Sequence, residues 1–242
     1  MTPVLYVVSY PKSGRTWLRV MLDDLGIEAV YTHDGSSFEG HLSVANLDSD
    51  KTKFEAGLVL LMVRDPRDVV ISGYFQVVRR LHLQTADSMS ISDFIRNPRY
   101  GIEKSVRFNL DWFAVAPEMA DLAIVRYEDL HKNTTRVLSA IVRFARAEAA
   151  TDIVGDVAFQ RSFAHMQQLE SIGGFEARYG NALTPADLAD PESYKVRRGI
   201  VGGYVDYLST RDQNFCNRII SKTDYEAQLQ YAMHLRSVLR YL

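Results

Sequence analysis

The sequence predicts an α/β fold in which a central parallel sheet is flanked by helices on both faces. Short β-branched runs alternate along the chain with longer segments of helical periodicity, and this alternation is typical of parallel α/β sheets. The 242 residues, 47% of them hydrophobic, are enough to bury a sizeable core in one domain, residues 1–242. Ligands of such folds lie beyond the carboxyl ends of the strands, so the loops that follow the strands are the candidate binding segments.

The first elements of the chain are predicted to be a strand, a helix and a second strand. Val4–Ser9 is a short apolar run rich in valine, which is typical of a buried strand. Thr16–Leu25 is expected to be a helix because its leucine and methionine residues recur at helical spacing. Glu28–Thr32 is the second predicted strand.

The third strand, Leu58–Val63, is entirely apolar and leads into a predicted helix over Pro66–Arg80. Asp65 is a good N-cap for that helix, Pro66 suits its first position, and Asp68 places a carboxylate near its positive end. The third strand therefore enters its helix through the sequence RDPRD.

The rest of the chain is expected to be mostly helical. Glu103–Val115 and Thr134–Ala145 have helical periodicity and lie on either side of the fourth strand, Leu122–Arg126. Gly173–Pro191 contains glycine and proline and is expected to be a long mobile loop. A later helix is expected to begin at Ser209, with Asp212 completing a box-like cap.

Composition excludes several classes of protein. The formal net charge is −2, which disfavours nonspecific binding to nucleic acid or to a membrane surface. Cys216 is the only cysteine, so an intrachain disulfide and a cysteine-based zinc cluster are excluded, and a cytoplasmic location is expected. No apolar stretch reaches the roughly 18 residues that a membrane span needs.

The stretch Ser9–Trp17, SYPKSGRTW, joins the first strand to the first helix through a loop that suits an anion. Backbone N–H groups at a helix start attract phosphate or sulfate, Lys12 adds a positive charge, and Gly14 permits close approach of the backbone. The loop is not that of a nucleoside triphosphatase, because Lys12 precedes its only glycine. Phosphate handling without a metal is therefore expected, although these residues alone also fit an ordinary turn with exposed Lys12 and Arg15.

Four stretches, in order from Ser9 to Tyr204, resemble the sulfotransferases that use 3′-phosphoadenosine 5′-phosphosulfate (PAPS). YPKSGRTW resembles the 5′-phosphosulfate loop of that family, usually YPKSGTTW, and VRDPRDVVISGYF resembles its 3′-phosphate motif. RYEDLHKNTTRVLSAIVRFA is similar to the YEDL segment, and RRGIVGGY is similar to the RKGxxGDWK segment. The resemblance implies a small, bacterial-like member of the cytosolic type, with a P-loop-like phosphosulfate-binding loop.

The resemblance also implies which residues bind the donor. The residues implied for the 5′-phosphosulfate are Lys12, Ser13, Gly14, Arg15, Thr16 and Trp17, with Arg15 in place of the usual Thr. Those implied for the 3′-phosphate are Arg64, Ser72, Arg197, Arg198 and Gly199, and those implied for the adenine are Trp17, Tyr127 and Phe163, with Arg161 replacing a small hydroxyl residue. Taken alone, Arg64 also fits an ion-pair group that caps a helix, and the aromatic residues also fit an ordinary core.

Sulfuryl transfer to an alcohol needs a base for the hydroxyl proton and a cation for the leaving phosphate. The resemblance implies Lys12 as the cation and His33, in VYTHD, as the base; the usual Lys two residues before that His is Tyr31 here. The ordinary pKa of histidine, near 6.5, suits proton abstraction near neutrality. His41 is the alternative base, and Asp34 is expected either to orient the His33 ring or to cap a turn.

The function that follows is transfer of a sulfuryl group from PAPS to a hydroxyl of a small or medium alcohol, phenol or sugar, releasing 3′,5′-ADP. The acceptor pocket is expected to involve residues 34–53, Tyr74, Phe75 and Val78, and the loop of residues 173–191. Two alternatives are a magnesium-dependent nucleotide or adenylylsulfate-type kinase and a nonenzymatic phosphonucleotide-binding protein. The sequence leaves the oligomeric state open.

Overall fold

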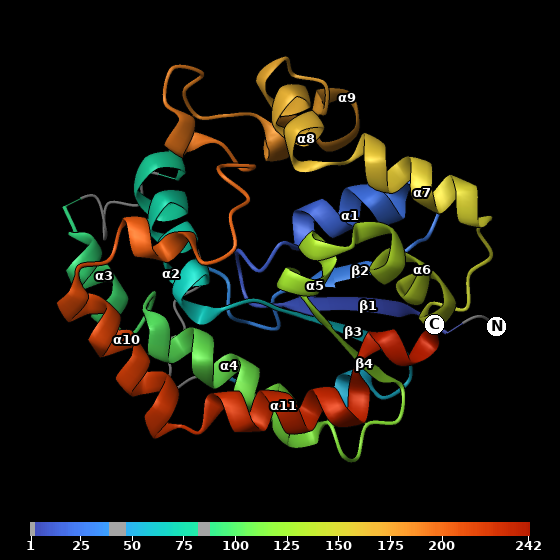
Figure 1. Ribbon diagram of the computed structural model, residues 1–242, viewed down its shortest axis with the longest axis horizontal. Helices are drawn as coiled ribbons and strands as arrows, with labels where there is room; N and C mark the ends of the chain where they lie inside the picture. The colour runs from blue at the N-terminus through green and yellow to red at the C-terminus, as the bar shows by residue number, and fades with distance from the viewer. Residues whose placement is uncertain (1–2, 39–46, 82–87) are drawn as a thin grey trace.

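A computed structural model describes residues 3–38, 47–81 and 88–242 (Figure 1). Its centre is a sheet of four parallel strands in the order β2-β1-β3-β4. The strands are β1 (Leu5–Ser9), β2 (Val30–Thr32), β3 (Leu58–Val63) and β4 (Leu122–Arg126). The third and fourth strands have their predicted bounds. The second begins at Val30 rather than Glu28, with Val30 itself largely exposed at the sheet edge.

The strand order places the loops after β1 and β3 side by side. Ser9 at the end of β1 pairs with Met62 near the end of β3. From β1 the chain crosses to β2 on one side, and from β3 it crosses to β4 on the other. This reversal opens a crevice beyond the carboxyl ends of β1 and β3, which is where parallel α/β sheets bind ligands.

One face of the sheet is covered by α1, α5, α6 and α7, which lie on the same side of it in Figure 1. Their bounds are α1 (Arg15–Asp24), α5 (Tyr127–Lys132), α6 (Thr134–Phe144) and α7 (Thr151–Gln160). Alternate strand residues such as Val7, Leu60 and Val125 point into this layer and are fully buried. The predicted helices Thr16–Leu25 and Thr134–Ala145 match α1 and α6 closely.

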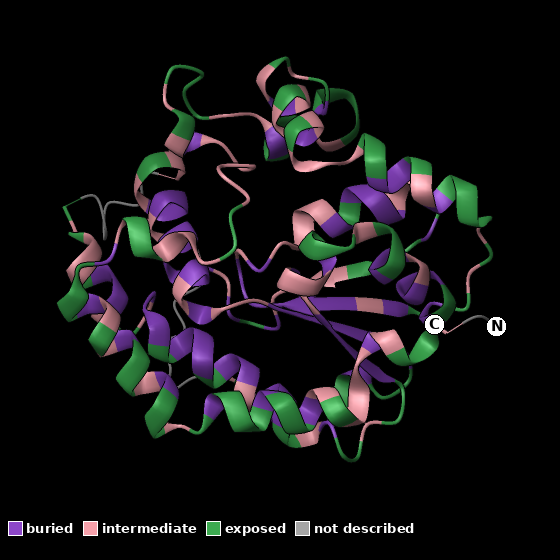
Figure 2. Ribbon diagram, in the orientation of Figure 1, coloured by how far each residue is buried: buried purple, intermediate pink, exposed green. Residues whose placement is uncertain are grey.

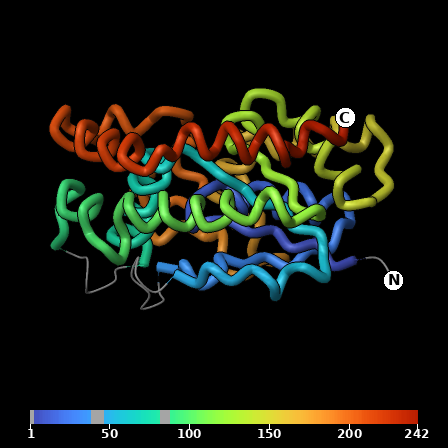
Figure 3. Tube along the Cα trace, turned by 90° about the horizontal axis from the view of Figure 1, so that it is seen from below, coloured from blue at the N-terminus to red at the C-terminus, as the bar shows by residue number. Residues whose placement is uncertain are grey.

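The other face carries α2 (Pro66–Phe75), α4 (Ile102–Val115), α10 (Thr210–Lys222) and α11 (Tyr225–Arg236). The intervening strand residues, among them Val8, Leu61 and Ile124, pack there and are also fully buried. Figure 3 shows α10 and α11 running along α4. In Figure 2 the strands β1, β3 and β4 are almost wholly buried. Helices on both faces of a parallel sheet confirm the predicted fold class.

The predicted helix Pro66–Arg80 changes character at Gln76. Asp65 caps it as expected, accepting a hydrogen bond from the Arg67 N–H at 2.8 Å. From Gln76 the backbone follows a π-helical path, η3 (Gln76–Arg80), in which the Leu81 N–H donates to the Gln76 carbonyl at 2.9 Å. Wider turns of this kind occur often at functional sites, and this one ends at the crevice.

The segment after α7 differs from the prediction. Residues 173–191, expected as a long mobile loop, contain the short helices α9 (Glu176–Tyr179) and η4 (Gly180–Leu183). Phe175 and Leu183 are buried there in a small core beneath α1 and α8 (Phe163–Ser171), and this burial orders the segment. The Ser209 cap of α10 is confirmed. The remaining elements are η2 (Thr52–Phe54), α3 (Ile91–Arg96), η5 (Pro191–Ser193), η6 (Gly203–Asp206) and η7 (Val238–Tyr241).

Candidate functional site

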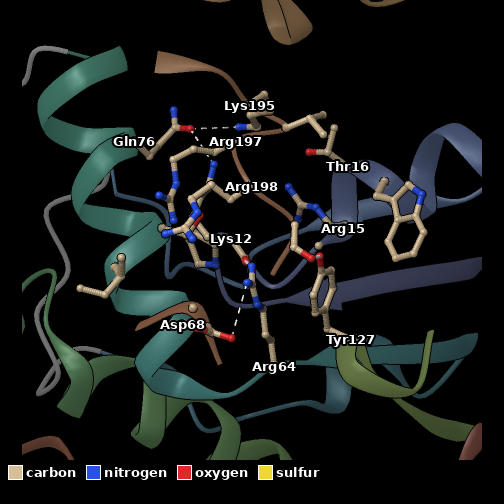
Figure 4. A pocket seen from close by; sticks show the side chains of 18 of the residues that line it. Lys12, Arg15, Thr16, Arg64, Asp68, Gln76, Tyr127, Lys195, Arg197 and Arg198 are labelled. Carbon is tan, nitrogen blue, oxygen red and sulfur yellow. Dashed lines mark hydrogen bonds and ion pairs between the residues drawn. The ribbon is translucent and has the colours of Figure 1, made fainter. Parts of the chain in front are cut away.

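A cavity of about 380 Å³ lies at the carboxyl ends of β1 and β3 (Figure 4). It brings together nearly all of the residues expected to bind the donor, together with His33, although they come from six separate parts of the chain. The expected residues that line it are Lys12, Gly14, Arg15, Thr16, Trp17, His33, Arg64, Ser72, Tyr127, Phe163, Arg197, Arg198 and Gly199. Ser13 is buried within the loop instead, where its N–H donates to the Tyr10 carbonyl at 3.3 Å.

The loop after β1 has an unusual backbone that only a glycine tolerates well at one point. Gly14 has φ 102°, and a Cβ atom there would lie 2.6 Å from the Tyr127 ring. Lys12 is also in the left-handed region, with φ 71°, and its Nζ donates to Gln76 Oε1 at 3.1 Å. Burial, followed by the charge of Lys195, lowers the pKa of Lys12 well below its usual value. The amino group is therefore in surroundings that favour an anionic partner.

Arg64, at the end of β3, connects the first loop to the late loop. Its guanidinium donates to the Lys12 carbonyl at 3.4 Å and to the Ile200 carbonyl at 3.2 Å, and it lies 4.3 Å from the centre of the Tyr127 ring. Asp68 lies 3.7 Å from the Arg64 Nη2 atom and is otherwise engaged with the backbone N–H groups of residues 202 and 204. The loops after β3 and around residue 200 thus form one wall of the cavity.

The late loop presents two further arginines and a glycine. Arg197 donates to Glu192 and to the Tyr207 hydroxyl, both at 2.7 Å, and Arg198 pairs with Asp206 at 2.7 Å. At Gly199, with φ 63°, a Cβ atom would lie only 2.1 Å from the Phe163 ring. Glycine is therefore required both for the backbone angle and for the close ring contact.

Three arginines that line the cavity each have one buried guanidinium nitrogen without a hydrogen-bond partner among the described residues. The nitrogens are Nη1 of Arg15, Nε of Arg64 and Nε of Arg197. A buried donor without an acceptor costs about 1–3 kcal/mol, and more when it is charged. Donors left in this state around one cavity fit a ligand with several anionic oxygens.

His33 lies at the end of β2 and is held at both ring nitrogens. Its Nδ1 lies 2.8 Å from the Ser9 carbonyl, and its Nε2 lies 2.8 Å from the Arg15 guanidinium. The carbonyl can only accept and the guanidinium can only donate, so the proton is on Nδ1 and the Nε2 lone pair accepts from Arg15. Burial, and secondarily the Arg15 charge, lowers the pKa of His33 to about 3.

Asp34 does neither of the two things expected of it. Its carboxylate is buried and pairs with Lys51 and Lys53, each at 2.6 Å, so the Ser9 carbonyl orients the His33 ring instead. Tyr31 packs against Arg19 and is not among the described residues that line the cavity. The alternative base, His41, lies outside the described residues.

The aromatic side chains form one wall. The rings of Trp17 and Tyr127 meet edge to face at 5.9 Å, and Trp17 Nε1 donates to the Arg161 carbonyl at 2.6 Å. The Arg161 side chain itself turns away to Asp24. His131, which sequence reasoning did not single out, also lines the cavity beside these rings.

The structure adds further residues to the site. Gln76 lies four positions after Ser72, one helical turn along the same face, and this spacing was the available signal for it. Lys195 lines the cavity ahead of Arg197, while Arg80 and Glu170 support it from behind. Of the expected acceptor residues, Phe75 packs beneath Arg197, and Tyr179 bonds to Asp23, so the segment of residues 173–191 mainly supports α1.

The described part of the chain contains neither a membrane-spanning helix nor a metal-binding cluster. No helix in residues 3–38, 47–81 and 88–242 is both long and apolar enough to cross a membrane. Within the same part of the chain, no three or more His, Cys, Asp or Glu side chains are placed to hold a metal ion.

Known proteins with similar sequences are sulfotransferases. The family model described as the sulfotransferase domain matches residues 36–228. A 3-beta-hydroxysteroid sulfotransferase of Cavia porcellus is 25% identical over 84% of this chain and 77% of its own length, and sulfotransferase 2A1 of Macaca fascicularis is 20% identical over 92% and 85%.

Solved structures share the fold. Mouse sulfotransferase SULT7A1, complexed with PAP, has a TM-score of 0.69 at 15% identity and covers 97% of this chain and 90% of its own. Retinol dehydratase, in a complex with retinol and PAP, has a TM-score of 0.66 at 15% identity, covering 92% and 81%. The family model begins after the Lys12 loop and after His33, so the roles of those residues depend on the geometry of the cavity.

Proposed function

Since this chain belongs to the sulfotransferase family, we propose that its cavity binds PAPS and that it transfers the sulfuryl group to a hydroxyl of a small or medium acceptor. The observation that carries the proposal concerns three arginines that line one cavity, Arg15, Arg64 and Arg197. Each has a buried guanidinium nitrogen that no described residue satisfies. The donor carries anionic groups at both ends of its ribose, and the arginines come from separate loops. The cavity therefore suits two separated anions.

The 5′-phosphosulfate is assigned to the loop after β1. Lys12, the N–H groups at the start of α1 and the Arg15 guanidinium all border this part of the cavity. A planar guanidinium at position 15 suits direct, bidentate pairing with a phosphate or sulfate. This assignment gives the unpartnered Arg15 Nη1 an acceptor.

The 3′-phosphate is assigned to the wall made by Arg64, Ser72 and the late loop. Arg64 and Arg197 each have an Nε without a partner among the described residues. The Arg198 guanidinium pairs with the half-exposed Asp206 carboxylate and lies over the Tyr207 ring. The adenine is assigned to the aromatic wall of Trp17, Tyr127 and Phe163, which offers flat apolar surface at the edge of the same cavity.

His33 is assigned as the general base. With the proton on Nδ1 and donated to the Ser9 carbonyl, Nε2 is the atom that accepts the acceptor's hydroxyl proton. In this structure the Arg15 guanidinium donates to the Nε2 lone pair. The donor's phosphosulfate competes for the same guanidinium, so donor binding would free Nε2 and offset the positive charge that lowers the pKa of His33.

Transfer then proceeds by in-line displacement. The acceptor oxygen forms a bond to sulfur as the bond between sulfur and the bridging phosphate oxygen breaks. The electron pair of the broken bond stays on 3′,5′-ADP, and the hydroxyl proton moves to His33 Nε2. Lys12 meets the charge that develops on the leaving phosphate, so positioning and electrostatics supply the rate.

The acceptor is assigned to the part of the cavity lining formed by Ser37, Phe38, Ile71 and Leu81, a mainly apolar set. Such a lining suits an alcohol, a phenol or a sugar with an apolar face. The solved relatives include complexes with retinol and with androsterone, which are apolar molecules.

The test uses purified protein, sulfur-labelled PAPS and a panel of alcohols, phenols and sugars. Transfer of label to at least one hydroxyl, with one 3′,5′-ADP formed for each product, is the expected result. Phosphate transfer from a nucleoside triphosphate would instead favour a kinase. Binding of 3′,5′-ADP without transfer to any acceptor would favour a nonenzymatic nucleotide-binding protein.

A further inference from the structure

Two lysines from distant parts of the chain converge on one amide oxygen in the cavity. Lys12 Nζ donates to Gln76 Oε1 at 3.1 Å, and Lys195 Nζ donates to the same atom at 3.4 Å (Figure 4). Both ammonium groups can donate to an acceptor placed near this oxygen. An anion bound at this point of the cavity would therefore lie within reach of both lysines.

The buried carboxylate of Glu170 holds the backbone at Lys195. Glu170, fully buried, accepts hydrogen bonds from the backbone N–H groups of Lys195 at 2.6 Å and Val196 at 2.7 Å, and it lies 3.5 Å from Arg80. These contacts fix the backbone at Lys195 and thereby its approach to the cavity. Lys195 is thus a positioned side chain and not a solvated surface lysine.

Lys195 lies on the side of the cavity where transfer is proposed to occur. Its charge contributes to the lowered pKa of both Lys12 and His33. It also lines the same cavity as these two groups. An anion bound between Lys12 and His33 would therefore lie within reach of Lys195 as well.

We propose that Lys195 is a catalytic residue that binds the transferring sulfuryl group together with Lys12, and that Gln76 holds the two ammonium groups until the donor arrives. The inference depends on the proposed function. In the displacement described above, Lys195 donates to a nonbridging sulfuryl oxygen, while Lys12 donates toward the bridging oxygen that leaves with the phosphate. Lys195 keeps its proton throughout and acts by charge.

The test compares binding of two nucleotides that differ at the sulfuryl group. Equilibrium affinities for PAPS, without acceptor, and for 3′,5′-ADP are measured for the wild type, Lys195→Met and Lys195→Arg. Lys222→Met, an exposed lysine on α10, is the matched control. Because Lys195 contacts only the sulfuryl group, Lys195→Met should weaken PAPS binding roughly 10- to 100-fold and leave 3′,5′-ADP binding nearly unchanged.

Turnover gives a second readout. Lys195→Met should lower kcat by at least about tenfold, and Lys195→Arg should recover part of the loss because it keeps the charge. Equal losses of PAPS and 3′,5′-ADP binding in Lys195→Met, or no loss of either, would overturn the inference. If Lys195→Met does not fold, as judged by circular dichroism, Lys195→Gln is measured in the same way.

Failure of the proposed function has a different signature. A wild-type protein that neither binds 3′,5′-ADP nor transfers label from PAPS would overturn both proposals. The wild type could instead bind 3′,5′-ADP and transfer label, while Lys195→Met keeps the wild-type ratio of PAPS affinity to 3′,5′-ADP affinity. That result would overturn only the role of Lys195.

Discussion

Replacing Arg15 by methionine should raise the pKa of His33. The Arg15 guanidinium donates to His33 Nε2 at 2.8 Å, so protonation of the ring requires this bond to break. Burial is the larger cause of the low pKa, about 3, and the Arg15 charge is the second. Methionine has a similar length but neither a charge nor a donor, so Arg15→Met isolates the second cause.

The size of the effect follows from the contact. A hydrogen bond from a charged donor contributes about 1.5–3 kcal/mol, and one pKa unit corresponds to about 1.4 kcal/mol. Loss of the bond should therefore raise the pKa of His33 by about one to two units. The pKa should remain below the ordinary value near 6.5, because the ring stays buried in the variant.

The assay is a nitrogen NMR titration of protein labelled at histidine, with His33 assigned from the spectrum of His33→Gln. In the wild type the ring should remain neutral at pH 5 with its proton on Nδ1, and in Arg15→Met the midpoint should move upward. Arg211→Met, an exposed arginine on α10, should leave the midpoint unchanged. An unchanged midpoint in Arg15→Met, or a wild-type proton on Nε2, would refute the reasoning.

Other variants test the remaining assignments. His33→Gln should retain 3′,5′-ADP binding and lose roughly 10²- to 10⁴-fold in turnover, whereas His234→Gln should retain both; full turnover in His33→Gln would exclude it as the base. Arg64→Ala should weaken 3′,5′-ADP binding by about 10- to 100-fold in calorimetry, and Arg67→Ala, at the same helix start, should not. An Arg64→Ala affinity equal to that of the wild type would exclude Arg64 from binding the 3′-phosphate. Gly199→Ala, whose new methyl carbon would lie 2.1 Å from a ring, should lower nucleotide affinity or stability, and wild-type values of both would contradict the close contact. Because the pKa of His33 is about 3 when folded and near 6.5 when unfolded, the unfolded chain binds more protons between these values. Urea unfolding should therefore show stability falling from pH 7 to pH 5, and falling less in His33→Gln; equal declines would argue against the low pKa.

The fold was predictable from the sequence because its signals are local. Runs such as Leu58–Val63 are apolar throughout and short, and they match β3 at both ends. The Asp65 cap likewise depends on neighbours along the chain. Val30 is largely exposed at the sheet edge, and the shortened β2 there is the kind of boundary that local signals fix poorly.

The walls of the cavity were predictable from motifs, but their connections were not. Lys12 and Lys195 both contact Gln76, although they are 64 and 119 positions away from it along the chain. The π-helical turn that begins at Gln76 leaves no mark in the apolar periodicity. The contact of Arg15 with His33 requires β2 to lie beside β1, which only the sheet order determines.

The central claim is that one cavity binds both phosphate groups of a single nucleotide, and calorimetry tests it most directly. Titrating the wild type with 3′,5′-ADP and with 5′-AMP compares ligands that differ only in the 3′-phosphate. We expect 3′,5′-ADP to bind at least about tenfold more tightly than 5′-AMP, since at least one charge-assisted bond is added. Equal affinity for the two nucleotides would contradict it.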